Sequence, residues 1–280
     1  ATMAGMLYLV PTPIGNLGDI SLRCRETLEQ ADFIAAEDTR VTLKLLNHLG
    51  IKKSLVSYYE HNKAFKGNVI LDRILAGETC ALVSDAGSPA ISDPGEDLVA
   101  LCAERGITVT SIPGCCAGIT ALTLSGLPTR RFTFEGFLSV NKAERKKHLD
   151  SLKNEPRTMI FHEAPHKLKT TLSDLRDTFG DTRRISLCRE LTKLNEEVLR
   201  LTLAEAVAYY EENAPRGEYV LVVEGAGEGS TSDEAFWIDM TVPEHVAYYV
   251  EQGMTKKDAI KAAARDRGVP KNEVYQQVLD

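Results

Sequence analysis

The sequence lacks the features that would place it in several large classes of protein. Its 280 residues include six cysteines but no Cys-x-x-Cys spacing, which argues against a disulfide framework and against a zinc ribbon. No apolar run approaches the ~20 residues needed to cross a bilayer, and no basic segment followed by an apolar one opens the chain. The composition therefore predicts a protein of the reducing cytoplasm without a membrane segment.

Net positive charge is also missing, since the formal net charge is -7. This argues against a nonspecific nucleic-acid binder, so any RNA contact must be local and directed by shape. Apolar residues make up 43% and charged residues 26% of the chain, as in globular proteins with a sizeable core. The length exceeds that of a usual single domain, and at least two lobes are expected.

Familiar nucleotide-binding motifs are absent as well. Neither GxGxxG nor GxxxxGK[ST] occurs, so nicotinamide and P-loop sites are unsupported. The segment from His162 to His166 does fit HExxH, the zinc-protease pattern, which needs its histidines one helical turn apart. Because this segment directly follows a predicted strand and Pro165 would stand inside the helix, we expect no metal site and keep zinc hydrolysis only as a rival interpretation.

Hydrophobic periodicity in the first half alternates between strand and helix. Strands are predicted at 7–10, 33–36, 54–58, 80–84 and 108–112, with helical patterns at 22–31, 43–49, 68–76, 97–104 and 119–124. Helical crossovers between successive strands are typical of a mainly parallel sheet.

The rhythm changes at 126–129, which places a lobe boundary near residue 128. Beyond it, strands are predicted at 131–138, 158–161, 185–188 and 219–223, and helices at 142–153, 168–179 and 203–213. Residues 226–232 have linker composition, and a capping pattern from Thr255 to Asp258 opens a helix-turn-helix-like tail. The predicted fold class is α/β, with lobes at 1–128 and 129–225 and a linker with a small helical tail at 226–280.

Three loops follow predicted strands, where ligands of parallel α/β sheets collect. Residues 11–16 are stiffened by two prolines, and residues 113–118 place small residues at the start of a helix. The long loop 84–95 is the strongest signal, because its small residues let a ligand approach the backbone and Asp85 can accept from an amine or a ribose hydroxyl. Each loop also admits a simpler interpretation as a turn without a ligand.

Several longer segments carry a family resemblance. They are LYLVPTPIGNLGDIS, AAEDTR, VSDAGSPAISDPG, GLPTRRFTFEGFL, PRTMIFHEAPHKL, CRELTK and RGEYVLVVEG. Together they span nearly the whole chain and resemble the tetrapyrrole-methylase-like class of S-adenosylmethionine-dependent methyltransferases. Within that class, the sequence is most similar to the bacterial enzymes that 2′-O-methylate a cytidine ribose in the decoding region of small-subunit (16S) ribosomal RNA.

The resemblance implies two α/β lobes with S-adenosyl-L-methionine in the crevice between them, an rRNA substrate within the assembled 30S subunit, and a homodimer. It implies that the cofactor touches Pro11, Thr12, Ile14, Asp85, Gly87, Ser88, Cys116, Ala117, Phe161, His162, Leu191, Tyr219 and Val220. The chain departs from the family pattern at two of these contacts: Cys115-Cys116 stands where Gly-Pro-Cys-Ala is expected, and residues 161–164 read Phe-His-Glu-Ala in place of Phe-Tyr-Glu-Ser.

Methyl transfer from a sulfonium needs alignment and exclusion of water more than elaborate machinery. A positioned side chain could still assist deprotonation of the ribose hydroxyl. Asp38 and Arg40 follow one predicted strand and His61 and Asn62 follow the next, which makes these four the catalytic candidates. Asp38 could equally cap a helix, and residues 60–62 could form a polar turn.

Other interpretations stay open. A basic helix face (Lys142, Arg145, Lys146, Lys147) could contact RNA phosphates or simply be solvated. A non-enzymatic assembly factor could bind RNA through the tail, whose basic residues are Lys256, Lys257, Lys261, Arg265, Arg267 and Lys271. The same fold could also methylate a tetrapyrrole or a modified histidine on a protein.

Overall fold

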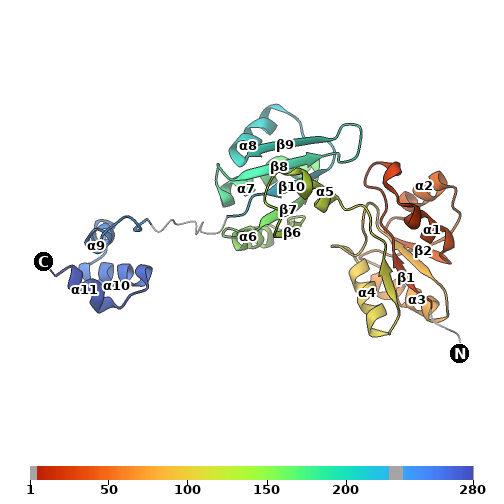
Figure 1. Ribbon diagram of the computed structural model, residues 1–280, viewed down its shortest axis with the longest axis horizontal. Coiled ribbons are helices and arrows are strands. Elements are labelled where there is room, and N and C mark those ends of the chain that lie inside the picture. The colour runs from red at the N-terminus through yellow and green to blue at the C-terminus, as the bar shows by residue number, and fades with distance from the viewer. Residues whose placement is uncertain (1–4, 227–235, 280) are drawn as a thin grey trace. The chain divides into compact units, whose positions relative to one another are not determined.

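The computed structural model describes residues 5–226 and 236–279, so all but Ala226 of the predicted linker 226–232 lies outside the described residues. Residues 5–145 and 158–224 form one compact unit, and residues 146–157, 225–226 and 236–279 form a second. Figure 1 shows the order of the elements along the chain. Among the described residues, no helix is long and apolar enough to cross a membrane.

The first unit begins with a parallel five-stranded sheet. Its strands are β1 (Leu7–Leu9), β2 (Phe33–Ala36), β3 (Ser54–Ser57), β4 (Cys80–Val83) and β5 (Val109–Ser111), in the order β3-β2-β4-β1-β5. All neighbouring pairs are parallel, which confirms the predicted topology class. The carboxyl ends of all five strands therefore lie along the same edge.

Helices cover both faces of this sheet. They are α1 (Leu22–Gln30), α2 (Thr39–Leu49), α3 (Lys63–Leu75) and α4 (Gly95–Glu104). Leu7 and Leu9 point to the face covered by α3 and α4, whereas Val10 belongs to the core under α1 and α2. This alternation along one strand is what a sheet buried on both sides requires. Helices α2 and α3 begin earlier than predicted, because the apolar residues of their first turns, Val41 and Phe65, are exposed and do not continue the buried apolar period.

A mixed sheet follows, as predicted. Its strands are β6 (Phe132–Gly136), β7 (Thr158–Glu163), β8 (Arg184–Arg189), β9 (Glu197–Thr202) and β10 (Tyr219–Val223), in the order β6-β7-β10-β8-β9. Only β6 and β7 pair in parallel. The edge strand β9 was not predicted, since its side chains are only partly buried and give no clear period.

Three helices of this unit pack on or beside the second sheet. Helix α5 (Ala117–Leu124) contacts β7 and β10, α8 (Leu203–Glu212) contacts β8 and β9, and α7 (Leu168–Phe179) packs against α8. Short 3-10 turns, η1 (Leu17–Asp19) and η2 (Pro165–Lys167), and helix α6 (Lys142–Ser151) complete the elements before the tail. The lobe boundary near residue 128 stays a prediction.

The tail contains α9 (Val242–Glu251), α10 (Lys256–Arg267) and α11 (Lys271–Gln277). Val246, Ile260 and Val274 lie in its own apolar core. The predicted cap at Thr255 is present, because its hydroxyl accepts from the Asp258 N–H. Helix α9 was not predicted, although Thr241 and Glu244 form a full capping box at its start.

Candidate functional site

The three predicted ligand loops are joined by backbone and side-chain hydrogen bonds. β1 and β4 are neighbours, so the loops that follow them meet, and Thr12 and Gly87 exchange two backbone hydrogen bonds of 3.1 and 3.0 Å. The Ser88 hydroxyl donates to the Cys115 carbonyl at 2.8 Å, which attaches the third loop. Loops distant in sequence thus form one surface at the carboxyl edge of the sheet.

The loop after β4 holds an unusual backbone conformation. Ala90 and Ser92 have φ of 67° and 55°, a region that non-glycine residues adopt at a cost of about 1 kcal/mol or more. The Asp93 carboxylate accepts from the backbone N–H groups of Ala90 (3.0 Å) and Gly95 (2.8 Å), and these bonds hold the turn. Such strain persists where the surroundings fix the chain, often at functional sites.

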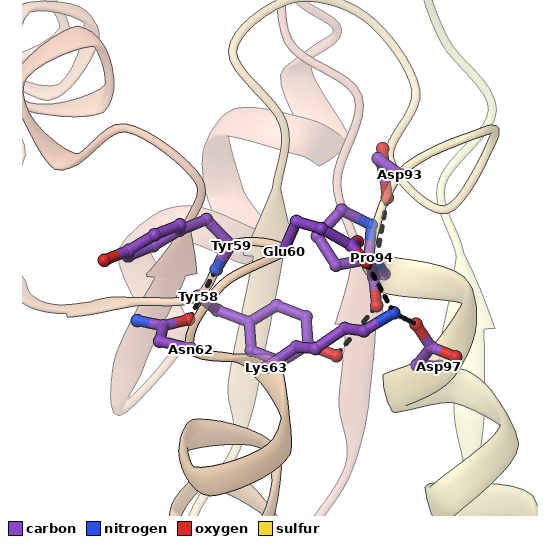
Figure 2. A network of polar contacts seen from close by, with 9 residues as sticks. Tyr58, Tyr59, Glu60, Asn62, Lys63, Asp93, Pro94 and Asp97 are labelled. Atoms are coloured by element: carbon purple, nitrogen blue, oxygen red, sulfur yellow. Dashed lines mark hydrogen bonds and ion pairs between the residues drawn. The ribbon is translucent and has the colours of Figure 1, made fainter. Parts of the chain in front are cut away.

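A buried tyrosine fixes the end of the same loop. The Tyr58 hydroxyl donates to the Pro94 carbonyl at 2.7 Å, and burial raises the pKa of Tyr58 to about 12, so the phenol stays protonated (Figure 2). The Lys63 ammonium lies 3.0 Å from Glu60 and 2.7 Å from Asp97, which ties the start of α3 to α4 (Figure 2). The polar network therefore supports the loop that Asp93 shapes.

A cavity of about 330 Å³ opens beside these loops. Residues of both sheets line it, including Ile14, Ala117, Leu191 and Val220, which give it apolar surface. The Phe134 and Phe137 rings contact the His162 ring at centroid distances of 5.6 and 5.5 Å. The volume of the cavity is within the range of sites that bind small molecules.

Acidic side chains dominate the polar lining of this cavity. The five carboxylates are Glu37, Asp85, Asp93, Glu190 and Glu218, against Lys193 as the one lysine or arginine. Desolvation raises the pKa of Glu37, and Asp85, Asp93 and Asp38 raise it further by repulsion. Burial also raises the pKa of Asp93 and lowers that of His162, which favours neutral imidazole. The cavity suits a ligand with positive charge and an apolar portion.

Most of the residues predicted to touch the cofactor lie at this cavity. Those that line it are Ile14, Asp85, Ser88, Ala117, His162, Leu191, Tyr219 and Val220. The others do not line it. Thr12 and Gly87 form the backbone bridge, Pro11 is buried, Cys116 is the N-cap of α5, and Phe161 is fully buried in β7. Cofactor contact by any of the thirteen stays a prediction.

The four catalytic candidates do not line the cavity. Asp38 caps α2 and its carboxylate accepts from the Arg40 backbone and guanidinium at 3.0 and 3.2 Å, which lowers the pKa of Asp38. Its backbone N–H donates to the Asp85 carboxylate at 3.1 Å. Asn62 accepts from the Tyr59 N–H at 2.7 Å and thereby shapes a turn, while His61 is exposed. Their catalytic roles stay predictions.

Residue-by-residue reasoning passed over several lining residues. Glu37 stands directly before Asp38, and Glu190 and Lys193 lie within the CRELTK segment, so the signal was present. Phe134 in β6 and Phe137 just after it lie in the GLPTRRFTFEGFL segment, but their apolar rings indicate no particular chemistry. Only the fold brings them to His162.

The HExxH segment has a structural role. His162 lies in β7, whereas His166 lies in η2, so one helix does not present both rings. The Glu163 carboxylate is buried and accepts from the Thr171 hydroxyl at 2.6 Å and the Ala164 N–H at 2.8 Å. Within residues 5–226 and 236–279, no group of three or more potential ligands could hold a metal ion. This geometry argues against zinc hydrolysis.

The predicted basic face on α6 is partly engaged within the chain. Arg145 donates to the Asp174 carboxylate at 2.8 Å and to the Thr171 hydroxyl at 2.7 Å, and Lys146 pairs with Asp150 at 2.7 Å. These contacts reduce the charge that the face can offer to RNA.

Comparison with known proteins identifies the class first. The family described as Tetrapyrrole (Corrin/Porphyrin) Methylases matches residues 6–207, and similar solved structures share the fold. The methyltransferase CobJ has a TM-score of 0.61 at 17% identity, covering 80% of this chain and 95% of its own. A Thermus thermophilus uroporphyrin-III C-methyltransferase complexed with S-adenyl homocysteine has a TM-score of 0.55 at 18% identity, covering 80% and 98%.

Relatives with similar sequences place the chain more closely within this family. Proteins named ribosomal RNA small subunit methyltransferase I are 51% identical in Halalkalibacterium halodurans and 49% in Bacillus subtilis, each covering 97% of this chain and 93% of the relative. The Escherichia coli O157:H7 relative of that name is 42% identical, covering 99% and 95%. The chain therefore belongs to the tetrapyrrole methylase family, and within it to the family of these relatives. The predicted family and fold class are confirmed.

Proposed function

We propose that the protein transfers a methyl group from S-adenosylmethionine to the 2′-oxygen of a cytidine ribose in small-subunit ribosomal RNA. The full-length relatives are named as methyltransferases of small-subunit rRNA, which supports the reaction class and the substrate class. The cytidine and the ribose oxygen rest on the resemblance of the sequence segments described above. The single observation that supports the site is the carboxylate-lined cavity at the carboxyl edge of the parallel sheet.

The cavity fits this methyl donor. S-adenosylmethionine supplies, when bound, a methyl group activated by a positively charged sulfonium. Asp85, Glu190 and Glu218 offer negative charge around such a cation, and Ile14, Ala117 and Leu191 offer apolar surface to an adenine ring. The backbone of loops 11–16 and 84–88 is held rigidly enough to donate and accept hydrogen bonds at fixed positions.

Glu37 is the side chain in the cavity best suited to receive the proton of the ribose hydroxyl. A carboxylate with a raised pKa is a stronger base than an ordinary one, and desolvation raises the pKa of Glu37. It follows β2 directly and lies one residue before the predicted candidate Asp38. We therefore add Glu37 to the predicted catalytic set of Asp38, Arg40, His61 and Asn62.

The remaining proposals concern context. We propose that the protein acts in the cytoplasm as a homodimer on the assembled 30S subunit. We also propose the three-part division into a cofactor-loop lobe (1–128), a second α/β lobe (129–225) and a helical tail (226–280). The family resemblance supports the homodimer and the 30S substrate.

The test incubates the protein with methyl-labelled S-adenosylmethionine and small subunits from cells that lack the gene, and maps the label by nuclease digestion and mass spectrometry. Label on a cytidine ribose, strongly reduced in Asp85→Asn at a limiting concentration of S-adenosylmethionine, is the expected result. Label on a base, or label on RNA at another nucleoside, would contradict the proposed position. Cofactor binding with no label in RNA would redirect the search to a tetrapyrrole or a protein acceptor.

One observation favours the alternative of a non-enzymatic RNA-binding factor. A cavity of about 570 Å³ in the tail is lined by Lys256, Lys257 and Lys271 together with Tyr275. Lysines beside an aromatic ring suit contact with nucleic acid. This alternative predicts RNA binding that persists without S-adenosylmethionine and no transfer of label.

A further inference from the structure

A second cavity of about 550 Å³ adjoins the carboxylate-lined cavity, and Glu190 and Tyr219 line both. We call the first the donor cavity and the second the β8–α8 cavity, because its other lining residues come from β8, β9, α8 and the segments before β9 and β10. Apart from Glu190 and Tyr219, its polar side chains have no part in the predicted site or in the donor proposal. Its size is within the range of ligand pockets.

Glu190 separates the two cavities and is held in a demanding conformation. Its φ is 52°, and its carboxylate accepts from the Glu218 N–H at 2.9 Å and from the Lys193 ammonium at 3.4 Å. Gly217 permits this arrangement, since a Cβ there would lie 2.2 Å from a Glu190 carboxylate oxygen. The position of Glu190 is thus fixed by two hydrogen bonds and by the space that Gly217 leaves for its side chain.

Residues of the short loop after Glu190 line both cavities. Lys193 lines the donor cavity and Asn195 lines the β8–α8 cavity, with the side chain of Leu194 between them fully exposed. Thr192 has φ of 70°, and its buried hydroxyl has no hydrogen-bond partner among the described residues. Backbone strain together with a buried hydroxyl that lacks a hydrogen-bond partner is typical of a loop that binds a ligand or is under a functional constraint.

The chemistry of the β8–α8 cavity differs from that of the donor cavity. Arg189 lies 3.7 Å from Glu197, whereas Arg216 is exposed and has no ion-pair partner within the described part of the chain. Asn195 and Asn213 bring side-chain amides, and the half-buried Tyr209 brings an aromatic ring. Arginine binds phosphate, amides read base edges, and aromatic rings stack on bases.

We propose that the β8–α8 cavity binds a nucleotide of the acceptor RNA, with its base between Tyr209 and Asn195 and its phosphate at Arg216. The inference rests on the proposed function and deepens it, because it assigns the acceptor a place beside the methyl donor. A ribose between base and phosphate then lies near Glu190 and Tyr219, the residues common to both cavities. An RNA ribose can reach an active site in this way only when its base leaves the stack, and such a base needs a pocket.

The experiment measures methyl transfer to small subunits from cells lacking the gene, and in parallel the affinity for S-adenosylmethionine by calorimetry. Arg216→Ala and Asn195→Ala are compared with Arg184→Ala, an exposed arginine at the opposite end of β8 from Arg189. We expect each cavity variant to raise KM for subunits about tenfold, the loss typical of one charge-assisted or base-edge hydrogen bond. The affinity for S-adenosylmethionine and the thermal midpoint should stay at the wild-type values, and Arg184→Ala should match the wild type throughout.

Wild-type KM for subunits in both cavity variants would overturn the inference, as would an equal loss of affinity for S-adenosylmethionine and subunits. Failure of the proposed function would look different, because the wild type would then bind subunits without methylating them. In that case, the loss or retention of subunit binding in Arg216→Ala still decides whether this cavity holds RNA.

Discussion

The donor cavity and the β8–α8 cavity share Glu190 and Tyr219 but differ in charge. Five carboxylates and one lysine line the donor cavity, whereas two arginines, two asparagines and two carboxylates line the other. The donor cavity is therefore strongly acidic and suits a cationic cofactor, whereas the other is formally neutral and repels a polyanionic substrate less. The difference indicates how one enzyme could hold both reactants within reach of each other.

Backbone strain is distributed in the same pattern. The four non-glycine residues with positive φ in the described chain are Ala90, Ser92, Glu190 and Thr192. Two lie in the loop after β4 and two in the loop after β8, and Ser92 and Glu190 line the donor cavity. Each sheet therefore contributes one strained loop to the site, as expected of backbone that fixes ligand-binding groups.

The largest expected effect concerns Glu37. Glu37→Gln removes the proposed proton acceptor, so kcat should fall about a hundredfold or more, as for loss of a general base. In the wild type, the basic form of Glu37 exists above its raised pKa, so kcat should fall as pH decreases through that pKa. The variant should lose this acidic limb in the pH profile of kcat.

The control for this prediction is the affinity for S-adenosylmethionine, because Glu37→Gln should lower that affinity far less than it lowers the rate of methyl transfer. A variant with wild-type kcat would exclude Glu37 as the base and return attention to Asp38 and His61.

Asp85→Asn separates charge from hydrogen bonding in the donor cavity. The amide oxygen can still accept from the Asp38 N–H, but the negative charge is lost. We expect affinity for S-adenosylmethionine to fall roughly tenfold to a hundredfold, the effect of one interaction with a charged group. Affinity for small subunits should be retained, and a parallel loss of both would show that the variant disturbs the fold instead.

Two glycines with nearly equal φ test the shared residue Glu190. Gly217 and Gly50 have φ of 72° and 71°, but an added Cβ meets Glu190 at Gly217 and nothing within 4 Å at Gly50. Alanine at Gly50 should cost about 1 kcal/mol of folding free energy, because left-handed backbone disfavours a Cβ, and alanine at Gly217 should cost more, because Glu190 must also move. Only Gly217→Ala should also weaken the binding of both substrates, so that KM for S-adenosylmethionine and KM for small subunits each rise severalfold.

Equal kinetic effects in the two glycine variants would mean that Glu190 has no special role between the cavities. Chemical denaturation supplies the stability values, and steady-state kinetics with each substrate varied in turn supplies the KM values.

The smallest expected effect on activity is at Tyr58. Tyr58→Phe leaves the Pro94 carbonyl without its donor, which should lower unfolding free energy by about 1–3 kcal/mol. The loosened loop should raise KM for S-adenosylmethionine more than it lowers kcat. Tyr8→Phe is the matched control, since the Tyr8 hydroxyl meets only the Met6 sulfur at 3.7 Å. Indistinguishable denaturation curves for the two variants would count against the supporting role of Tyr58.

Sequence reasoning predicted the fold well where burial is strong and periodic. β2, α7 and β10 begin and end as predicted, because each has a continuous apolar period bounded by polar or turn residues. β9 and α9 escaped prediction, since β9 is a half-buried edge strand and α9 follows a segment with no apolar rhythm. Helices α2 and α3 begin before the predicted residues, because the apolar side chains in their first turns are exposed.

The donor cavity was predictable at its loops and not at its opposite side. Asp85 and Ser88 lie in a segment whose small residues indicate close approach of a ligand to the backbone. Phe134 and Glu218 lie in segments that carry the family resemblance, but neither residue type at those positions indicates a ligand. Their relevance depends on strand order in the second sheet, which no local pattern encodes. The β8–α8 cavity could not be predicted, because its residues come together only through the packing of α8 beside β8, β10 and the unpredicted β9.

The most direct test of the account is a crossed binding measurement on two variants. Affinities for S-adenosylmethionine and for small ribosomal subunits are determined by titration for the wild type, Asp85→Asn and Arg216→Ala. The account predicts that Asp85→Asn loses affinity for S-adenosylmethionine alone and that Arg216→Ala loses affinity for subunits alone. Variants that lose both affinities together, or neither, would contradict the division of the two substrates between the two cavities.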